Sequence, residues 1–481
     1  MRPGAAVVVL ALAAQAGELR GQAAPTCSED LAAARAKIEA DYGGYRLEIV
    51  GPRKAAFGRA FTRLEAHARR AAGDCFGVLN AFAEWFGDPH LFIYQTVRLD
   101  SAESARRAAA VRVVPLSEDG ARAYFTAAGK RLDPIEGIWY DRGLRLAVVP
   151  DSSAGRGHFL AVVLRSDTAG WRPGAVRGTI ARRGDGTYDI ELSGPNYVRW
   201  HRHAHLHRDV VLRLDPGIWG KAFPVPAADS GTLDPADVHR PTLAVRHGAV
   251  VISMPSHDPA YKPVLDSLLA ANAALIRDTR FLLVDLRGNE GGSSYTAAGL
   301  APYVASRDRR PGPVKRWHAV MLSSPDQIRY AKVAFGADTS AFVRSLVARM
   351  EASPGQFVAL DTAAGGDGEP DIPVAEGPAR VGVLIDRGTV SAAEVAVEFA
   401  LRSTRATVFG EPTAGALDYE QVNIVPLDAR EKRWFLGYPT ITRDPSLPVG
   451  GMRGKGIQPD VRVRWGPVPD PIDYVIRALG R

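Results

Sequence analysis

Several patterns that mark large classes of proteins are missing from this chain. There is no strict period, which excludes a collagen or a coiled coil, and no internal repeat is visible. Only one long apolar run occurs, which excludes a polytopic membrane protein. Disorder is excluded as well, because 46% of the 481 residues are hydrophobic and glycine and proline are spread along the chain. The length leaves room for two to four domains.

Blocks of like charge are missing too. The net charge is +7, yet the positive residues are scattered, and no aromatic residues are interleaved with them. A nucleic-acid-binding surface is usually a concentrated basic patch. We therefore expect no nucleic-acid partner.

The N-terminus has the order of a secretory signal. Arg2 precedes the unbroken apolar run Ala5–Ala14, and small residues follow at 14–16 and 21–23. A short buried helix is the alternative. Ten apolar residues are too few to span a bilayer, so no stable membrane span is expected. The pattern predicts a signal peptide over 1–23 and a protein that is exported, either periplasmic or secreted.

The only cysteines are Cys27 and Cys75, and they lack both a CxxC spacing and a Cys/His metal spacing. In an exported chain, two cysteines favour one disulfide. It would join the start of the mature chain to the end of a helical segment. Two unrelated buried thiols are the alternative.

The apolar pattern changes between the first and second parts of the chain. Residues 24–96 carry apolar residues at helical spacing, which predicts an N-terminal helical region. The middle domain, 97–225, reads as mostly β from about residue 137. Its short strands, such as 144–149, are separated by turns and suggest a small barrel or sandwich. Residues 102–128 mix helix and strand signals and cannot be placed.

The last part of the chain, 226–481, has an α/β pattern. A stretch rich in Pro and Asp, 224–241, reads as the linker at its start, and the α/β signal follows that linker. Continuous apolar runs at 281–284 and 381–385 predict buried strands, and helical patterns alternate with them. This alternation predicts a mostly parallel sheet covered by helices. In such sheets, sites form beyond the carboxyl ends of the strands.

Two of these strand ends carry candidate chemistry. Asp285–Ser293 holds glycines, among them Gly291 and Gly292, that let backbone N–H groups face an anion. The alternative is a flexible turn. Ser391 stands at the start of a helix, where its hydroxyl and the Ala392 N–H would suit a nucleophile and an oxyanion donor. Its Ser-x-x-Glu pattern is also that of a simple capping box.

A serine nucleophile needs a base, and three further residues are candidates for supporting roles. His90 lies between a turn signal and an apolar segment. Asp418 and Glu420 lie in a Gly/Pro-rich turn, where either carboxylate could orient the imidazole. Taken alone, His90 reads as an ordinary turn residue and the two acids as surface groups.

Four histidines alternate along one predicted strand face, at positions 201, 203, 205 and 207. A metal site is one interpretation, but a solvated strand face is favoured. We expect neither a metal nor a cofactor.

Together these motifs resemble the tail-specific and tricorn-type serine peptidases, the C-terminal processing family. That family shows D-x-R-x-N-x-G-G, S-A-x-E, G-x-x-T-x-G and G-I-x-P-D in this order, with a D-x-H near its N-terminal helical region. The matching segments, in chain order, are Asp88–His90, Asp285–Gly292, Ser391–Glu394, Gly410–Gly415 and Gly456–Asp460.

The resemblance implies a crotonase-like α/β fold, also seen in ClpP, and hydrolysis of a peptide or protein substrate. It implies Ser391 as nucleophile and Ala392 with Gly291 or Gly292 as oxyanion donors. The processing branch has a lysine where this chain has Ala416, so the resemblance favours the His-containing branch, with His90 as base oriented by Asp418 or Glu420. No carboxylate-binding loop of a PDZ domain is found between 97 and 240.

Two other functions remain open on the same scaffold. One is a non-catalytic ligand- or peptide-binding module, which the missing lysine suggests. The other is a different crotonase-like activity, such as acyl-CoA chemistry. The substrate, the cleavage preference and the oligomeric state are not encoded in any motif that we recognise.

Overall fold

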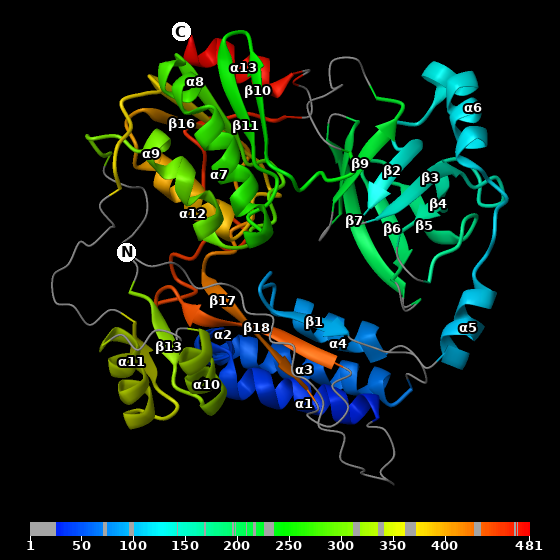
Figure 1. Cartoon of the computed structure of the whole chain (residues 1–481). Coiled ribbons are helices and arrows are strands. Elements are labelled where there is room, and N and C mark those ends of the chain that lie inside the picture. The colour runs from blue at the N-terminus through cyan, green and yellow to red at the C-terminus, as the bar shows by residue number, and fades with distance from the viewer. Residues whose placement is uncertain are drawn as a thin grey trace.

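The computed structural model consists of three bodies, shown in Figure 1. One, called the helical body, packs the N-terminal helices on a five-stranded sheet, one is a β-barrel, and one is a mostly parallel sheet covered by helices. The structure describes residues 26–481 except 71–74, 96–100, 142, 168–169, 195–196, 198, 208, 215–217, 226–234, 311–317, 335–340, 361–371, 428–433, 466–467 and 469. The predicted signal peptide lies outside the described residues. No described helix is both long and apolar enough to cross a membrane.

The first body packs N-terminal helices against a five-stranded sheet. Its core joins apolar residues of the helices, such as Leu31 and Phe82, to Leu436 and Tyr438 of the sheet. The helices are α1 (Cys27–Asp41), α2 (Gly43–Glu48), α3 (Gly51–Ala68), α4 (Cys75–Glu84), α10 (Pro325–Ala334) and α11 (Ala341–Ala352). The strands are β1 (Phe92–Gln95), β13 (Val320–Leu322), β14 (Phe357–Ala359), β17 (Tyr419–Pro426) and β18 (Trp434–Thr442).

A disulfide joins Cys27 to Cys75 in this body, which confirms the predicted bridge. Cys75 is the first residue of α4, so the bridge links the starts of two helices rather than reaching the end of one.

The second body is a closed antiparallel barrel made of β2–β9, which confirms the predicted β character from about residue 137. Alternation decides which side chains fill it: Leu144, Leu146 and Val148 of one strand point into the core, while Ala147 packs on the outside. The strands are β2 (Gly137–Asp141), β3 (Leu144–Pro150), β4 (His158–Ser166), β5 (Val176–Arg182), β6 (Tyr188–Ser193), β7 (Arg199–His207), β8 (Val211–Leu214) and β9 (Ile218–Phe223).

The segment that the sequence could not place precedes the barrel. It forms the helices α5 (Ser101–Ala110) and α6 (Glu118–Ala128), followed by the 3-10 turn η1 (Gly129–Arg131).

The third body is the predicted α/β part. Its sheet has the order β10-β11-β12-β15-β16-β19, parallel except for the first pair. The strands are β10 (Thr242–Arg246), β11 (Ala249–Ser253), β12 (Phe281–Asp285), β15 (Arg380–Ile385), β16 (Ala406–Gly410) and β19 (Val461–Arg462). The helical elements are η3 (Pro259–Tyr261), α7 (Lys262–Ala271), α8 (Ala273–Asp278), η4 (Ser294–Leu300), α9 (Ala301–Val304), α12 (Ala392–Leu401) and α13 (Pro471–Leu479).

One feature differs from the predicted layout of domains. Residues 226–481 do not form one separate body, because β13, β14, β17 and β18 leave the α/β part and join the sheet of the helical body. β18 pairs with β1 from Phe92↔Gly437 to Gln95↔Trp434. These strands bury apolar residues such as Leu436 against the N-terminal helices, so the two parts of the chain share one core.

Candidate active site

The carboxyl ends of three parallel strands supply most of the candidate site. β12 leads into the glycine loop at 286–292, and β15 leads through the turn at 386–390 to Ser391. β16 leads into the loop at 411–418. The motifs at 285–293 and 391–394 therefore converge at one edge of the sheet, as expected for parallel strands.

Ser391 has an unusual backbone conformation, with φ 56° and ψ −118°. A non-glycine residue rarely adopts this region, and such strain persists where the surrounding structure enforces it. Its N–H donates to Glu394 Oε2 at 2.9 Å, and α12 begins at the next residue. The serine thus stands at the positive end of a helix, on a fixed turn.

Glu394 fixes the loop after β16 to the serine turn. Its fully buried carboxylate accepts bonds from Thr413 Oγ1 at 2.6 Å and from the N–H groups of Gly415 and Ala416 at 2.7 and 2.9 Å, as well as from Ser391. Burial raises the pKa of this carboxyl, and the surrounding donors oppose that shift. Glu394 is therefore a structural anchor and not only a helix cap.

His90 comes from the helical body and meets Ser391 across 301 positions of sequence. Its Nε2 lies 3.0 Å from Ser391 Oγ, and its Nδ1 lies 2.6 Å from the carbonyl oxygen of Tyr419. A carbonyl oxygen can only accept, so Nδ1 carries the proton and Nε2 is left to accept the serine hydroxyl. In this pairing the serine hydroxyl can donate its proton to His90 Nε2, which is what a nucleophile and its base require.

Asp88 shapes the turn that presents the imidazole. Its Oδ1 accepts the His90 N–H at 2.9 Å, and its Oδ2 accepts the Tyr42 hydroxyl at 2.7 Å. The side chain is buried, and burial raises its pKa while the bonds from Tyr42 and His90 lower it. The D-x-H motif is thus an Asx turn that is tied to the N-terminal helices.

Neither acid expected to orient His90 does so in the structure. Asp418 accepts the N–H groups of Met452 and Arg453 at 2.7 and 3.0 Å, and Glu420 accepts Arg443 Nε at 2.5 Å. Tyr419, the residue between the two acids, presents its carbonyl oxygen to the imidazole instead. The orienting group is therefore a main-chain carbonyl, which has no sequence signature.

The glycine loop has one N–H that is already in use. Gly291 donates to Asn289 Oδ1 at 2.9 Å, so its N–H is not open to a ligand. Within the described residues, no acceptor is recorded for the N–H of Gly292 or of Ala392. A Cβ on Gly291 would lie 2.8 Å from the Ser391 Cβ, so the loop touches the serine turn directly. Of the two expected glycine donors, Gly292 is the one with a free N–H.

His257 supports this loop and was missed in the sequence. It is fully buried, its N–H donates to the Gly291 carbonyl at 2.9 Å, and its Nδ1 lies 3.0 Å from Asn289 Oδ1. Asn289 Nδ2 donates to Met254 O, so its oxygen accepts and His257 Nδ1 donates. Burial lowers the pKa of His257 to about 4. A lone histidine after a strand carried no motif by which it could be found.

The histidine run at 201–207 lies on β7, and the side chains of His201, His203 and His207 are outside the described residues. His205 is exposed and Ala204 is buried, which agrees with a solvated outer face of the barrel.

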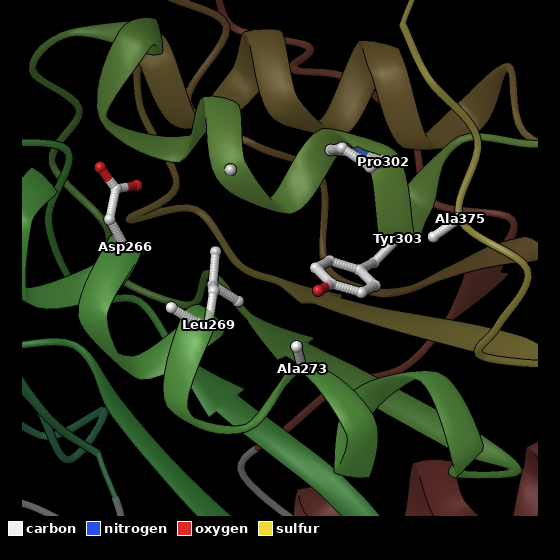
Figure 2. A pocket seen from close by; sticks show the side chains of 8 residues that line it. Asp266, Leu269, Ala273, Pro302, Tyr303 and Ala375 are labelled. Atoms are coloured by element: carbon white, nitrogen blue, oxygen red, sulfur yellow. The ribbon is translucent and has the colours of Figure 1, made fainter.

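Two cavities lie away from Ser391 and His90. One, of about 290 Å³, lies between α7 and α9. Leu269 and Tyr303 line its wall, as Figure 2 shows. The other, about 600 Å³, lies on β4, β5 and β6 of the barrel and includes Phe159 and Glu191 in its lining. Neither lining includes the serine or the histidine.

A serine on a strained turn, bonded to an imidazole and next to free backbone N–H groups, is the arrangement of a serine-type hydrolase. Residues 250–463 match the model of peptidase family S41. This part of the chain belongs to that family of serine-type peptidases, so the predicted class is confirmed. The match includes Ser391 and both glycine-rich motifs. It begins well after His90 in the sequence, so it does not include this residue.

Solved structures of proteases also resemble the chain weakly. A photosystem II D1 C-terminal processing protease is 15% identical over 95% of this chain and 98% of its own, with a TM-score of 0.35. Mature CPAF is 12% identical over 91% and 92%, with a TM-score of 0.42. The tricorn protease is 12% identical over 94% of this chain and 36% of its own, with a TM-score of 0.35. No curated protein matches the chain.

Proposed function

We propose that this protein is an exported serine peptidase of the His-containing branch, which hydrolyses peptide bonds through an acyl-enzyme on Ser391. The observation that carries the proposal is the 3.0 Å contact between His90 Nε2 and Ser391 Oγ, with Nδ1 held by the Tyr419 carbonyl. A catalytic fold of the crotonase type is supported by the parallel order β11-β12-β15-β16 with helices against it.

The proposed reaction begins with attack by Ser391 Oγ on the carbonyl carbon of the scissile bond. His90 Nε2 takes the hydroxyl proton, and the N–H groups of Ala392 and Gly292 bind the oxygen that becomes negative. His90 then gives the proton to the leaving amine, and the ester on Ser391 remains. A water molecule activated by His90 hydrolyses that ester and restores the serine.

The Tyr419 carbonyl fulfils one of the two roles of the acid in a triad. It fixes the tautomer and the orientation of the imidazole, because it accepts only the Nδ1 proton. It lacks the full negative charge that stabilises an imidazolium. We therefore expect Asp418 and Glu420 to affect the reaction only through the loops that they hold.

The decisive experiment is labelling with a fluorophosphonate, combined with a peptidase assay, of the wild type, Ser391→Ala and His90→Ala. We expect labelling and hydrolysis by the wild type only, with rates at least 10³-fold lower in either variant. Equal labelling of the wild type and Ser391→Ala would refute the proposal. A folded wild type that neither labels nor hydrolyses peptides would favour the non-catalytic binding module.

Export is supported by the apolar run behind Arg2 and by the disulfide between Cys27 and Cys75. Expression in a bacterium with a periplasm, followed by N-terminal sequencing, tests it. We expect a periplasmic or secreted product that begins after residue 23. A full-length product that stays in the cytoplasm would contradict export.

A further inference from the structure

The barrel sends one charged side chain out of its wall and into the α/β body. Arg213 lies on β8 and is buried, and its Nη2 donates to the main-chain oxygen of Arg287 in the glycine loop. The charged groups that act on it most strongly are Asp386, Asp285, Arg287 and Glu290, all in the α/β body. Each of these partners lies in the α/β body, so the guanidinium links the barrel to the glycine loop.

Gly288 is shaped to receive this guanidinium. A Cβ at Gly288 would lie 1.2 Å from Arg213 Nη1, and the residue has φ +67°, which favours glycine. Its N–H donates to Asp386 Oδ1 at 2.7 Å, and Asp386 also accepts the Gly388 N–H at 2.9 Å. The guanidinium therefore sits where the glycine loop meets the turn that leads to the serine.

A short chain of bonds connects this contact to the free N–H groups. Arg213 holds the carbonyl of Arg287, and Asn289, two residues further on, holds the Gly291 N–H. Gly292 follows directly. Burial lowers the pKa of Arg213, and Asp386 and Asp285 oppose that shift, so acids of the α/β body compensate the buried charge of the guanidinium.

We propose that Arg213 is a positioning residue through which the barrel fixes the glycine loop and its Gly292 N–H against Ser391. The barrel is then a required part of the active site and not only a neighbour that docks substrate. This inference rests on the proposed peptidase function for its kinetic consequence, but the contact itself can be tested without catalysis.

The test compares Arg213→Met and Arg213→Lys with a matched control, Lys221→Met. Lys221 is a buried cation on the next strand, β9, but its bond goes to Pro134 O, just before the first barrel strand, and its ring contact is Trp139 of β2. Hydrogen exchange of the amides at 286–292 and steady-state kinetics on a peptide ester are measured for each folded variant.

For Arg213→Met we expect at least tenfold faster exchange at 286–292 and a fall in kcat of about 100-fold with little change in KM, as for a displaced catalytic group. Arg213→Lys keeps the charge but loses the forked guanidinium. It should therefore recover part of the protection from exchange at 286–292 and part of kcat. Lys221→Met should change neither the exchange at 286–292 nor kcat.

Unchanged exchange at 286–292 in Arg213→Met, or the same change in Lys221→Met, would overturn the proposal. Should Arg213→Met not fold, the comparison of Arg213→Lys with Lys221→Met decides in the same way. A wild type without esterase or peptidase activity would refute the proposed function and leave the exchange result to decide the role of Arg213.

Discussion

The two halves of the candidate site are built in different ways. The serine half lies in one stretch of parallel sheet, where β12 and β15 are neighbours and each ends in its motif. The histidine half depends on pairing between β1 and β18, which are more than 330 positions apart. The family model matches the whole first half, but of the second half it includes β17 and β18 and not β1 or His90.

The difference shows where sequence motifs are informative. A serine turn and an oxyanion loop must be made of residues that follow one another, so they leave local signatures. A catalytic imidazole needs only to be held near the serine in the correct tautomer, and any hydrogen-bond acceptor at Nδ1 can fix that tautomer. Here the acceptor is the Tyr419 carbonyl, which any residue at that position would provide.

The largest expected effect concerns the histidine half. The disulfide closes a loop with a sequence separation of 48 residues and joins α1 to α4. Replacing both cysteines, in Cys27→Ser with Cys75→Ser, should lower the free energy of unfolding by about 2–4 kcal/mol. Urea unfolding of the wild type and the double variant measures this. A wild type whose midpoint is unchanged by reductant would argue against a stabilising bridge.

The next effect belongs to the serine half and depends on pH. The pKa of His257 is about 4 in the folded protein against an ordinary value of 6.5, because burial disfavours its charged form. The unfolded chain therefore binds more protons between these values, and stability falls as the pH drops from 6.5 to 4. The loss from this group is about 3 kcal/mol.

Urea midpoints of the wild type and His257→Gln between pH 7.5 and 4.5 isolate this contribution, since other groups titrate in both proteins. We expect a smaller loss of stability in the variant. Parallel curves for the two proteins would mean that His257 titrates normally.

A smaller effect returns to the histidine half. Asp88→Ala removes the acceptors for the His90 N–H and the Tyr42 hydroxyl. The imidazole should shift, and kcat should fall by about 10- to 100-fold with KM nearly unchanged. Asp88→Asn keeps an oxygen for the turn and should restore most of kcat. If the Asn and Ala variants are equally slow, the negative charge of Asp88 matters more than the turn.

The smallest expected effect tests Glu420, one of the two acids that the sequence suggested as the group that orients His90. Glu420 pairs with Arg443 and not with His90, so Glu420→Gln should lower kcat by less than about tenfold. A triad acid would cost roughly 10⁴-fold. Steady-state kinetics distinguishes the two, with His90→Ala as the reference for complete loss of the base. A loss comparable to that of His90→Ala would restore the carboxylate triad.

Much of the fold could be predicted because periodicity is local. The predicted strands 281–284 and 381–385 appear as β12 and β15, and the strand pattern from about residue 137 appears as the barrel. The boundary at 226 was misleading, since apolar alternation in β17 and β18 does not reveal which helices will cover them.

The site was predictable to the same extent. Ser391, His90 and the glycine loop stood out through turn chemistry and motif order, and the structure brings them together. Asp418 and Glu420 were favoured because a carboxylate is visible in a sequence and a carbonyl is not. His257 and Arg213 were not found, since their partners are fixed only by packing between distant segments.

The pairing of β1 with β18 also sets an order of events during synthesis. Tyr419 and β18 follow Ser391 in the chain, and Tyr419 is made 329 residues after His90, so the imidazole cannot be held against the serine until they have joined the N-terminal sheet. In the growing chain the Ser391 hydroxyl would have no proton acceptor until β18, near the end of the sequence, has been synthesised.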